Sequence, residues 1–284
     1  MWRATLPKHE YIDLILLQYQ PLVDINDSIN KIKQLVEKNR IKKNTLVVCP
    51  ELSLQQYICI AKSKKNFDTA ISINCNEIVS IKDIAIKYKL FLCITIFERF
   101  KDKYFNTALV INPKGNIIKK YRKKNIPSEI CYEESYYFDK SNNGYQLFSI
   151  GVFKIGILIC WDQWHSNAYQ ELKKKKVNLI ICPTAIGTCV SKLKKIQIAN
   201  EKSKWENVIE ANSLMNNIPV VVANRMGTER QKDTLIKFWG SSFMTDAHGT
   251  TIKKCKAKES IIKHRFYIKE QISIERMWNF QDIH

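Results

Sequence analysis

The stretch from Gly151 to Trp164 constrains the fold of this chain more than any other part of its sequence. It reads Gly-Val-Phe-Lys-Ile-Gly-Ile-Leu-Ile-Cys-Trp-Asp-Gln-Trp. The apolar, β-branched run from Phe153 to Ile159 predicts a buried strand, and it stops at Cys160, where polarity and period both change. The amides of the turn that follows such an elbow point at the sulfur and stabilise negative charge there. On the local pattern alone a core cysteine that closes a strand is the commoner arrangement, but the rest of the sequence reverses this preference.

The order of the expected elements predicts one layered domain. Strands alternate with helices in the first half of the chain, and hairpins lie between them, which favours an α/β sandwich of mixed sheets. Without a repeat or linker, residues 1–284 are expected to form a single domain with a short C-terminal arm, about 263–284, ending in Trp278-Asn279-Phe280. Strands are expected at 12–19, 45–49, 92–97, 107–111, 116–121, 147–149, 153–159, 177–182, 219–223, 241–245 and 250–254, and helices at 27–40, 77–90, 167–176 and 201–216. The irregular stretch 122–145 is too long for a simple connector, so a functional role is expected for it.

The composition is that of a globular protein, with 45% hydrophobic and 11% aromatic residues. No apolar run approaches the roughly 20 residues that span a bilayer, and the N-terminus lacks the apolar core of a secretory signal. We therefore expect a cytoplasmic protein with no membrane partner. Nine cysteines are present without a C-x-x-C pair, and Cys49, Cys93 and Cys182 lie in or at the ends of apolar runs. Reduced, mostly buried thiols are expected rather than disulfides or a zinc ribbon.

The formal net charge of +19 raises the question of nucleic-acid or anionic-membrane binding. Only 8 of the 46 basic residues are Arg, and Lys rises together with Ile and Asn. This pattern is typical of compositional drift in the coding genome rather than of a phosphate-binding face. No stacking-aromatic or basic-helix motif is present either, so we expect no nucleic-acid partner.

Three strand-like segments end in reactive side chains, namely Glu51, Lys123 and Cys160. Strand ends at one edge of a sheet are where α/β enzymes gather their chemistry. Glu51 is suited to take the thiol proton before Cys160 attacks, and Lys123 with the amide of Trp161 is suited to hold an oxyanion. Taken singly, Glu51 also fits a structural strand-end charge, and Lys123 fits one lysine among many.

Together these motifs resemble those of the nitrilase superfamily of carbon–nitrogen hydrolases over residues 12–280. Pro50-Glu51-Leu52, Tyr121-Arg122-Lys123 and Cys160-Trp161 follow the order and approximate spacing of its Glu-Lys-Cys triad. The stretches 159–164, 183–187, 224–229 and 238–243 are similar to one branch, the N-carbamoylputrescine amidases. The sequence departs from the family at Asn125, where a His is usual, at 165–167, at 211–216, after Phe138 and at the C-terminal end.

The resemblance implies a four-layer αββα sandwich of the nitrilase type, a homo-oligomer (a dimer or larger), and neither a cofactor nor a metal. It also implies a second glutamate in the site, Glu134, with Glu133 as the alternative. The implied reaction is hydrolysis of a small ureido substrate, N-carbamoylputrescine, to putrescine, carbon dioxide and ammonia through a thioester, a step of polyamine biosynthesis. Candidate substrate-binding residues are Tyr57, Trp161, Asp162, Thr184 and Ala185. The alternatives are another ureido or ω-amide hydrolase of the superfamily, such as a β-ureidopropionase, and a degenerate, non-catalytic member.

Overall fold

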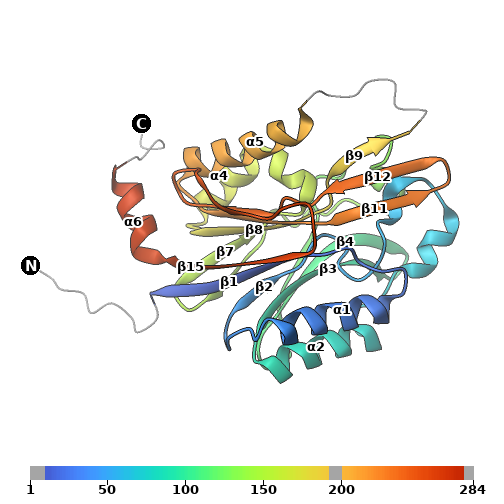
Figure 1. The fold of residues 1–284 in the computed structure, drawn as a ribbon, viewed down its shortest axis with the longest axis horizontal. Coiled ribbons are helices and arrows are strands. Elements are labelled where there is room, and N and C mark those ends of the chain that lie inside the picture. The colour runs from blue at the N-terminus through green and yellow to red at the C-terminus, as the bar shows by residue number, and fades with distance from the viewer. Residues whose placement is uncertain (1–9, 192–199, 278–284) are drawn as a thin grey trace, which may run out of the picture.

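Two six-stranded mixed sheets lie face to face at the centre of the fold, and helices cover the outer face of each sheet (Figure 1). The structure is a computed structural model, and it describes residues 10–191 and 200–277. The layers run helix, sheet, sheet, helix, as the family resemblance implies. No helix in these ranges combines the length and the apolar character needed to cross a membrane.

The first sheet has the strand order β15-β1-β2-β3-β4-β5. Strands β1, β2 and β3 are parallel, β4 and β5 follow as an antiparallel meander, and β15 pairs antiparallel with β1 at the other edge. The bounds are β1 Tyr11–Gln18, β2 Leu46–Val48, β3 Phe91–Phe100, β4 Lys103–Ile111, β5 Ile117–Arg122 and β15 Ser260–Tyr267, with α1 Ile25–Lys38 and α2 Asn76–Tyr88 on the outer face.

The second sheet has the order β14-β13-β10-β8-β7-β6, with β7, β8 and β10 parallel. Its strands are β6 Leu147–Ile150, β7 Phe153–Ile157, β8 Leu179–Thr184, β10 Val220–Asn224, β13 Phe243–Thr245 and β14 Thr251–Lys254, and its outer helices are α4 Ser166–Lys174 and α5 Glu201–Asn216. A third sheet, in the order β11-β12-β9, consists of β9 Gly187–Val190, β11 Met226–Gln231 and β12 Thr234–Trp239. The shorter elements are η1 Ile58–Ile60, η2 Lys64–Thr69, α3 Glu134–Tyr137 and η3 Cys160–Trp164, and α6 Ile268–Met277 follows β15.

The alternation of side chains along β1 shows how the layers form. Successive residues of a strand point to opposite faces of the sheet. Leu14 and Leu16 accordingly belong to the buried cluster shared by the two large sheets, whereas Ile15 and Leu17 belong to the cluster beneath α1 and α2. Both faces of β1 are therefore covered by other elements of the fold. For this reason the strand appears in the sequence as a continuous apolar run.

Several elements differ from the sequence-based expectation. Helix α1 starts earlier than Asp27-Ser28, because the Asp24 carboxylate accepts the amides of Asn26 and Asp27 and caps it. The hairpin of β11 and β12 was not predicted, since its residues do not form an apolar run. Residues 263–267 of the expected arm belong to β15, and the expected end at Trp278-Asn279-Phe280 lies outside the described residues.

Two of the nine cysteines are paired, contrary to the expectation of reduced thiols. A disulfide joins Cys131, in the loop before α3, to Cys189 in β9, with their Cα atoms 5.9 Å apart. The Tyr132 hydroxyl holds these segments together, since it donates to the Gly187 carbonyl and accepts the Gly187 amide. The pair was missed because 58 residues separate the two cysteines.

Candidate active site

Cys160 lies at a strained elbow shortly after strand β7 of the second sheet, which ends at Ile157. The Leu158 amide still donates to the Ile181 carbonyl of β8, and Cys160 then opens the short helix η3. Its φ is +42°, in the left-handed region that a side chain disfavours. Backbone strain of this kind persists only where the surroundings impose it, and it clusters at functional sites. The sequence was right that the chain turns at this cysteine.

The sulfur of Cys160 is held in a buried environment. The residue is 4% exposed, and its Sγ donates to the Ala185 carbonyl at 3.7 Å. Burial raises the pKa of the Cys160 thiol well above its ordinary value, the charge of Glu51 raises it further, and Lys123 acts in the opposite direction. The thiol is therefore protonated at rest, and nucleophilic attack requires a base beside it.

The Glu51 carboxylate, which follows β2, is a suitable base. Its Oε1 accepts hydrogen bonds from Asn106 Nδ2 at 2.7 Å and from Lys123 Nζ at 2.8 Å. Its Oε2 is buried and has no hydrogen-bond partner among the described residues. Because buried polar atoms are nearly always paired, an orphaned carboxylate oxygen indicates a place for a proton or a ligand.

The Lys123 ammonium is buried between two carboxylates. Besides Glu51, its Nζ contacts Glu134 Oε1 at 2.9 Å and Oε2 at 2.7 Å. Burial alone lowers the pKa of Lys123, but the charges of Glu134 and Glu51 outweigh it and raise the pKa well above the ordinary value. Lys123 is therefore a permanent positive charge in this site, suited to stabilise an anion.

Glu134, the first residue of α3, completes the cluster. It accepts a hydrogen bond from the Tyr57 hydroxyl at 2.7 Å. Burial raises its pKa to about 7, with Lys123 opposing and Glu51 adding to the shift. The other sequence candidate, Glu133, lies outside the cluster and pairs with Lys62 at 3.2 Å.

The topology explains why these side chains meet. Strands β2 and β3 are parallel and β4 runs back, so β5 points the same way as β2, and Glu51 and Lys123 follow their C-terminal ends. Strands β7 and β8 are parallel in the facing sheet, and Cys160 and Ala185 follow their ends. The Glu51 amide donates to the Thr184 carbonyl at 3.3 Å, which joins the two sheets at this edge.

Asp162 connects the elbow to the segment that carries Lys123. Its Oδ2 accepts the Tyr121 hydroxyl at 2.7 Å and the Ile159 amide at 2.9 Å. Its Oδ1 accepts the amide and the side-chain Nδ2 of Asn125, both at 2.9 Å. Both oxygens of this fully buried carboxylate are thus occupied by protein donors, and a contact of Asp162 with substrate stays a prediction.

The other candidate substrate-binding residues differ in how far their side chains are exposed to solvent. Tyr57, Thr184 and Ala185 are buried around the cluster, with the Tyr57 hydroxyl on Glu134 and the Ala185 carbonyl on the sulfur. Trp161 is partly exposed, and its ring packs against that of Trp164 at 5.9 Å. Trp161 is thus the member of the candidate set that extends from the cluster toward the surface.

Sequence reasoning missed Asn106, Tyr121 and Asn125 as members of the site. Asn106 was detectable as a polar residue within the apolar strand β4, where it binds Glu51. Asn125 was noted only as a departure from the family pattern, yet its side chain bridges Asp162 and the Tyr145 hydroxyl.

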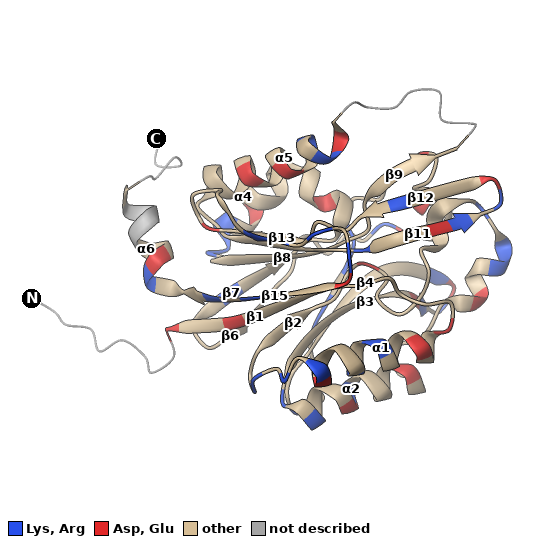
Figure 2. Cartoon of the chain, in the orientation of Figure 1, with Lys and Arg blue, Asp and Glu red and all other residues tan. Residues whose placement is uncertain are grey.

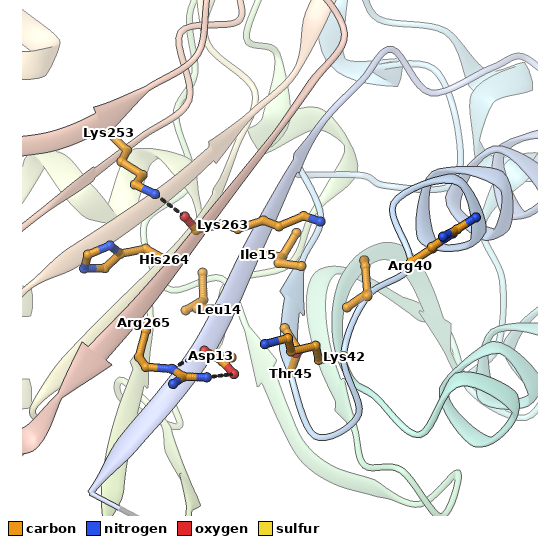
Figure 3. Close-up of a pocket in the computed structure, with 11 residues that line it drawn as sticks. Asp13, Leu14, Ile15, Arg40, Lys42, Thr45, Lys253, Lys263, His264 and Arg265 are labelled. Atoms are coloured by element: carbon orange, nitrogen blue, oxygen red, sulfur yellow. Dashed lines mark hydrogen bonds and ion pairs between the residues drawn. The ribbon is translucent and has the colours of Figure 1, made fainter.

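A pocket of about 380 Å³ lies at the other end of strand β2, where that strand begins (Figure 3). It is lined by Thr45, which precedes β2, whereas Glu51 follows that strand. Asp13 and Arg265 form a bidentate ion pair in the wall of this pocket, with N···O distances of 2.7 and 2.8 Å. This pocket is separate from the Cys160 cluster. Within the described ranges, no group of three or more His, Cys, Asp or Glu side chains is arranged to hold a metal ion.

Comparison with known proteins gives a family match over most of the chain. A model of the carbon–nitrogen hydrolase family matches residues 16–267. A solved structure, a carbon–nitrogen hydrolase from Helicobacter pylori G27, superimposes with a TM-score of 0.87 at 28% identity and covers 96% of this chain and 95% of that one.

Two curated relatives carry more specific names. A citrullinase from Francisella tularensis subsp. tularensis is 34% identical over 208 residues, which is 73% of this chain and 71% of the relative. An N-carbamoylputrescine amidase from Arabidopsis thaliana is 26% identical over 273 residues, which is 94% of this chain and 90% of the relative.

Proposed function

Because this chain belongs to the carbon–nitrogen hydrolase family, and is thus an enzyme that hydrolyses carbon–nitrogen bonds, we propose that it cleaves the ureido group of N-carbamoylputrescine with Cys160 as nucleophile. The observation that carries this proposal is the buried Lys123, which bridges Glu51 and Glu134 beside a strained cysteine. A base, an oxyanion-binding cation and a thiol together form an acyl-transfer set.

In the first half of the proposed reaction, the free Oε2 of Glu51 takes the thiol proton as Cys160 Sγ attacks the ureido carbonyl carbon. The Lys123 ammonium and the Trp161 amide stabilise the resulting oxyanion. The carbon–nitrogen bond to the terminal amino group then breaks, and the proton held by Glu51 passes to that nitrogen, so that ammonia leaves. A thioester of the N-substituted carbamic acid remains on the sulfur.

In the second half, Glu51 takes a proton from water, which attacks the thioester carbonyl. The carbon–sulfur bond breaks, the proton returns to the sulfur, and the released carbamic acid loses carbon dioxide to give putrescine. Glu134, with a pKa raised to about 7 by burial, holds Lys123 in place through both halves.

The substrate proposal rests on the near full-length resemblance to N-carbamoylputrescine amidases. The partly exposed ring of Trp161 supports it, since aromatic faces attract a cation such as the distal ammonium of this substrate. L-citrulline is a second candidate, because the citrullinase relative has the higher identity over a shorter span. Both molecules carry the same ureido group and differ at the far end.

Ammonia release from purified protein tests the proposal. The panel is N-carbamoylputrescine, L-citrulline, N-carbamoyl-β-alanine and an ω-amide, with Cys160→Ala as the blank. We expect the highest kcat/KM with N-carbamoylputrescine. A higher value with citrulline would replace the substrate and keep the reaction, whereas no release from any ureido compound would refute the proposal.

The cellular setting is part of the same proposal. We place the protein in the cytoplasm, in polyamine biosynthesis, as a homo-oligomer. Light scattering coupled to size-exclusion chromatography tests the last point, for which a mass above the 33.3 kDa of one chain is expected.

A further inference from the structure

The buried side chain of Arg225 holds the loop that carries Glu51. Its Nη1 donates to the carbonyls of Glu51 and Leu52, both at 2.9 Å, and its Nη2 donates to the Gln55 carbonyl at 3.0 Å. Leu52 has a φ of +47°, so the loop makes a strained turn directly after the proposed base. One guanidinium therefore fixes the backbone on both sides of this turn.

Glu229 extends the arrangement toward the second carboxylate. Its Oε1 accepts Arg225 Nη2 at 2.6 Å, and its Oε2 accepts the Tyr57 amide at 2.6 Å. The Tyr57 hydroxyl in turn donates to Glu134. Contacts thus run from the Arg225–Glu229 pair to Glu51 through the loop backbone and to Glu134 through Tyr57.

The place of the Arg225–Glu229 pair in the fold explains why its contacts lead to both Glu51 and Glu134. Arg225 directly follows β10 in the second sheet, and its amide donates to the Thr184 carbonyl at 3.1 Å. The same carbonyl accepts the amide of Glu51, which follows β2 of the first sheet. The pair lies where the edge bearing Cys160 meets the edge bearing Glu51.

A buried ion pair of this kind is weak evidence for a stabilising role. Removing two charges from water is costly, and apolar residues of similar volume often stabilise a fold equally well. The planar fork of Arg, however, binds several acceptors at defined angles, which a point-charge ammonium does not reproduce. The three loop carbonyls bound by Arg225 match this geometric use.

We propose that Arg225 and Glu229 are positioning residues for the reaction described above, which set where Glu51 and Glu134 stand relative to Lys123 and Cys160. The inference rests on the proposed function for its kinetic consequences. It identifies no new reacting group, because the pair acts through the backbone of residues 51–57 and through Tyr57.

Two variants that leave no unpaired buried charge test this role. Arg225→Lys keeps the positive charge but loses the planar guanidinium group with its several donors. Arg225→Met/Glu229→Leu removes the ion pair altogether. For both we expect kcat to fall about 10- to 100-fold, because small misplacements of reacting groups have effects of this size. KM should stay within about twofold, since the contact removed is not one with substrate.

A second readout does not depend on the substrate. The rate at which iodoacetamide alkylates Cys160, followed by peptide mass spectrometry, reports how well Glu51 accepts the thiol proton. This rate should fall in both variants. If the wild-type protein hydrolyses no ureido compound, the proposed function fails, and alkylation still tests the positioning role.

The matched control is Asp13→Leu/Arg265→Met. It removes the bidentate ion pair in the wall of the separate pocket of the first sheet (Figure 3). We expect this control to keep the wild-type kcat and alkylation rate. Circular dichroism and urea unfolding identify the variants that fold, and Arg225→Lys decides the question if the double variant does not. Wild-type kcat and alkylation in a folded variant, or a raised KM with unchanged kcat, would overturn the proposal.

Discussion

The Lys123 ammonium lies 2.7 and 2.9 Å from the two carboxylate oxygens of Glu134, and neither side chain is exposed to solvent. Lys123 also contacts Glu51, so one cation serves two buried carboxylates. Burial is the main physical reason that the pKa of Glu134 is raised, and the charge of Glu51 adds to it while Lys123 opposes it.

Glu134 should make the stability of the protein depend on pH. Its pKa is raised from 4.5 to about 7, so the folded state binds more protons than the unfolded state between these values. The contribution of Glu134 to the free energy of unfolding is therefore fully present below about pH 4.5. It is lost as the pH rises through 7, a change of about 3 kcal/mol. Urea unfolding of the wild type and Glu134→Gln at pH 4.5 and 7.5 measures it. A difference between the two proteins that does not vary with pH would contradict the assignment.

Asp162→Asn should loosen the cysteine elbow. All four hydrogen bonds to Asp162 come from donors, and an asparagine amide presents two hydrogens to two of them. We expect a loss on the order of 3 kcal/mol in the free energy of unfolding, with a lower kcat. Tyr145→Phe is the control, because it removes one of the two acceptors of Asn125 Nδ2 and leaves Asp162 intact, and it should lose about 1 kcal/mol. Equal stability of Asp162→Asn and wild type would show that the network is not needed.

The disulfide predicts a thiol count. Denatured, unreduced protein should react with Ellman's reagent at seven cysteines, and reduced protein at all nine. Cys131→Ala/Cys189→Ala should lose about 2–4 kcal/mol of stability, because the cross-link closes a long loop in the unfolded chain. Nine reactive thiols before reduction would show that the pair is open in solution.

The charge pattern predicts weak nucleic-acid binding. Figure 2 shows Lys and Arg spread over helices, strand ends and loops, with Asp and Glu among them. We expect duplex DNA to bind without sequence preference at about 10⁻⁴–10⁻⁶ M at physiological salt, the range of non-specific electrostatic association. A nanomolar, salt-resistant complex in a filter-binding assay would contradict the view that the +19 charge reflects composition.

Local patterns predicted a layered α/β sandwich and the ends of the reactive strands, whereas the four-layer order came from the family resemblance. The apolar run before Cys160 predicted a buried strand, and parallel strands then bring Glu51 and Lys123 to one edge. These inferences depend on periodicity and on where a run ends, both of which are short-range properties of a sequence.

The supporting contacts were beyond sequence reasoning because they are long-range. Arg225 binds carbonyls of the Glu51 loop 170 to 174 positions earlier in the chain, and no local pattern relates the two segments. Asp162 could be identified as a residue beside Cys160, but not as one whose oxygens face protein donors instead of a ligand. Which partners a buried polar group meets is decided by the tertiary packing.

The rate of ammonia release by Cys160→Ala, with N-carbamoylputrescine as substrate, shows whether Cys160 is the nucleophile. Cys93→Ala is the matched control, because Cys93 is also a free, buried cysteine but lies within β3. We expect a rate for folded Cys160→Ala that is indistinguishable from the protein-free blank, and near wild-type turnover for Cys93→Ala. Turnover by folded Cys160→Ala at a rate close to that of the wild type would contradict the assignment of Cys160 as the nucleophile.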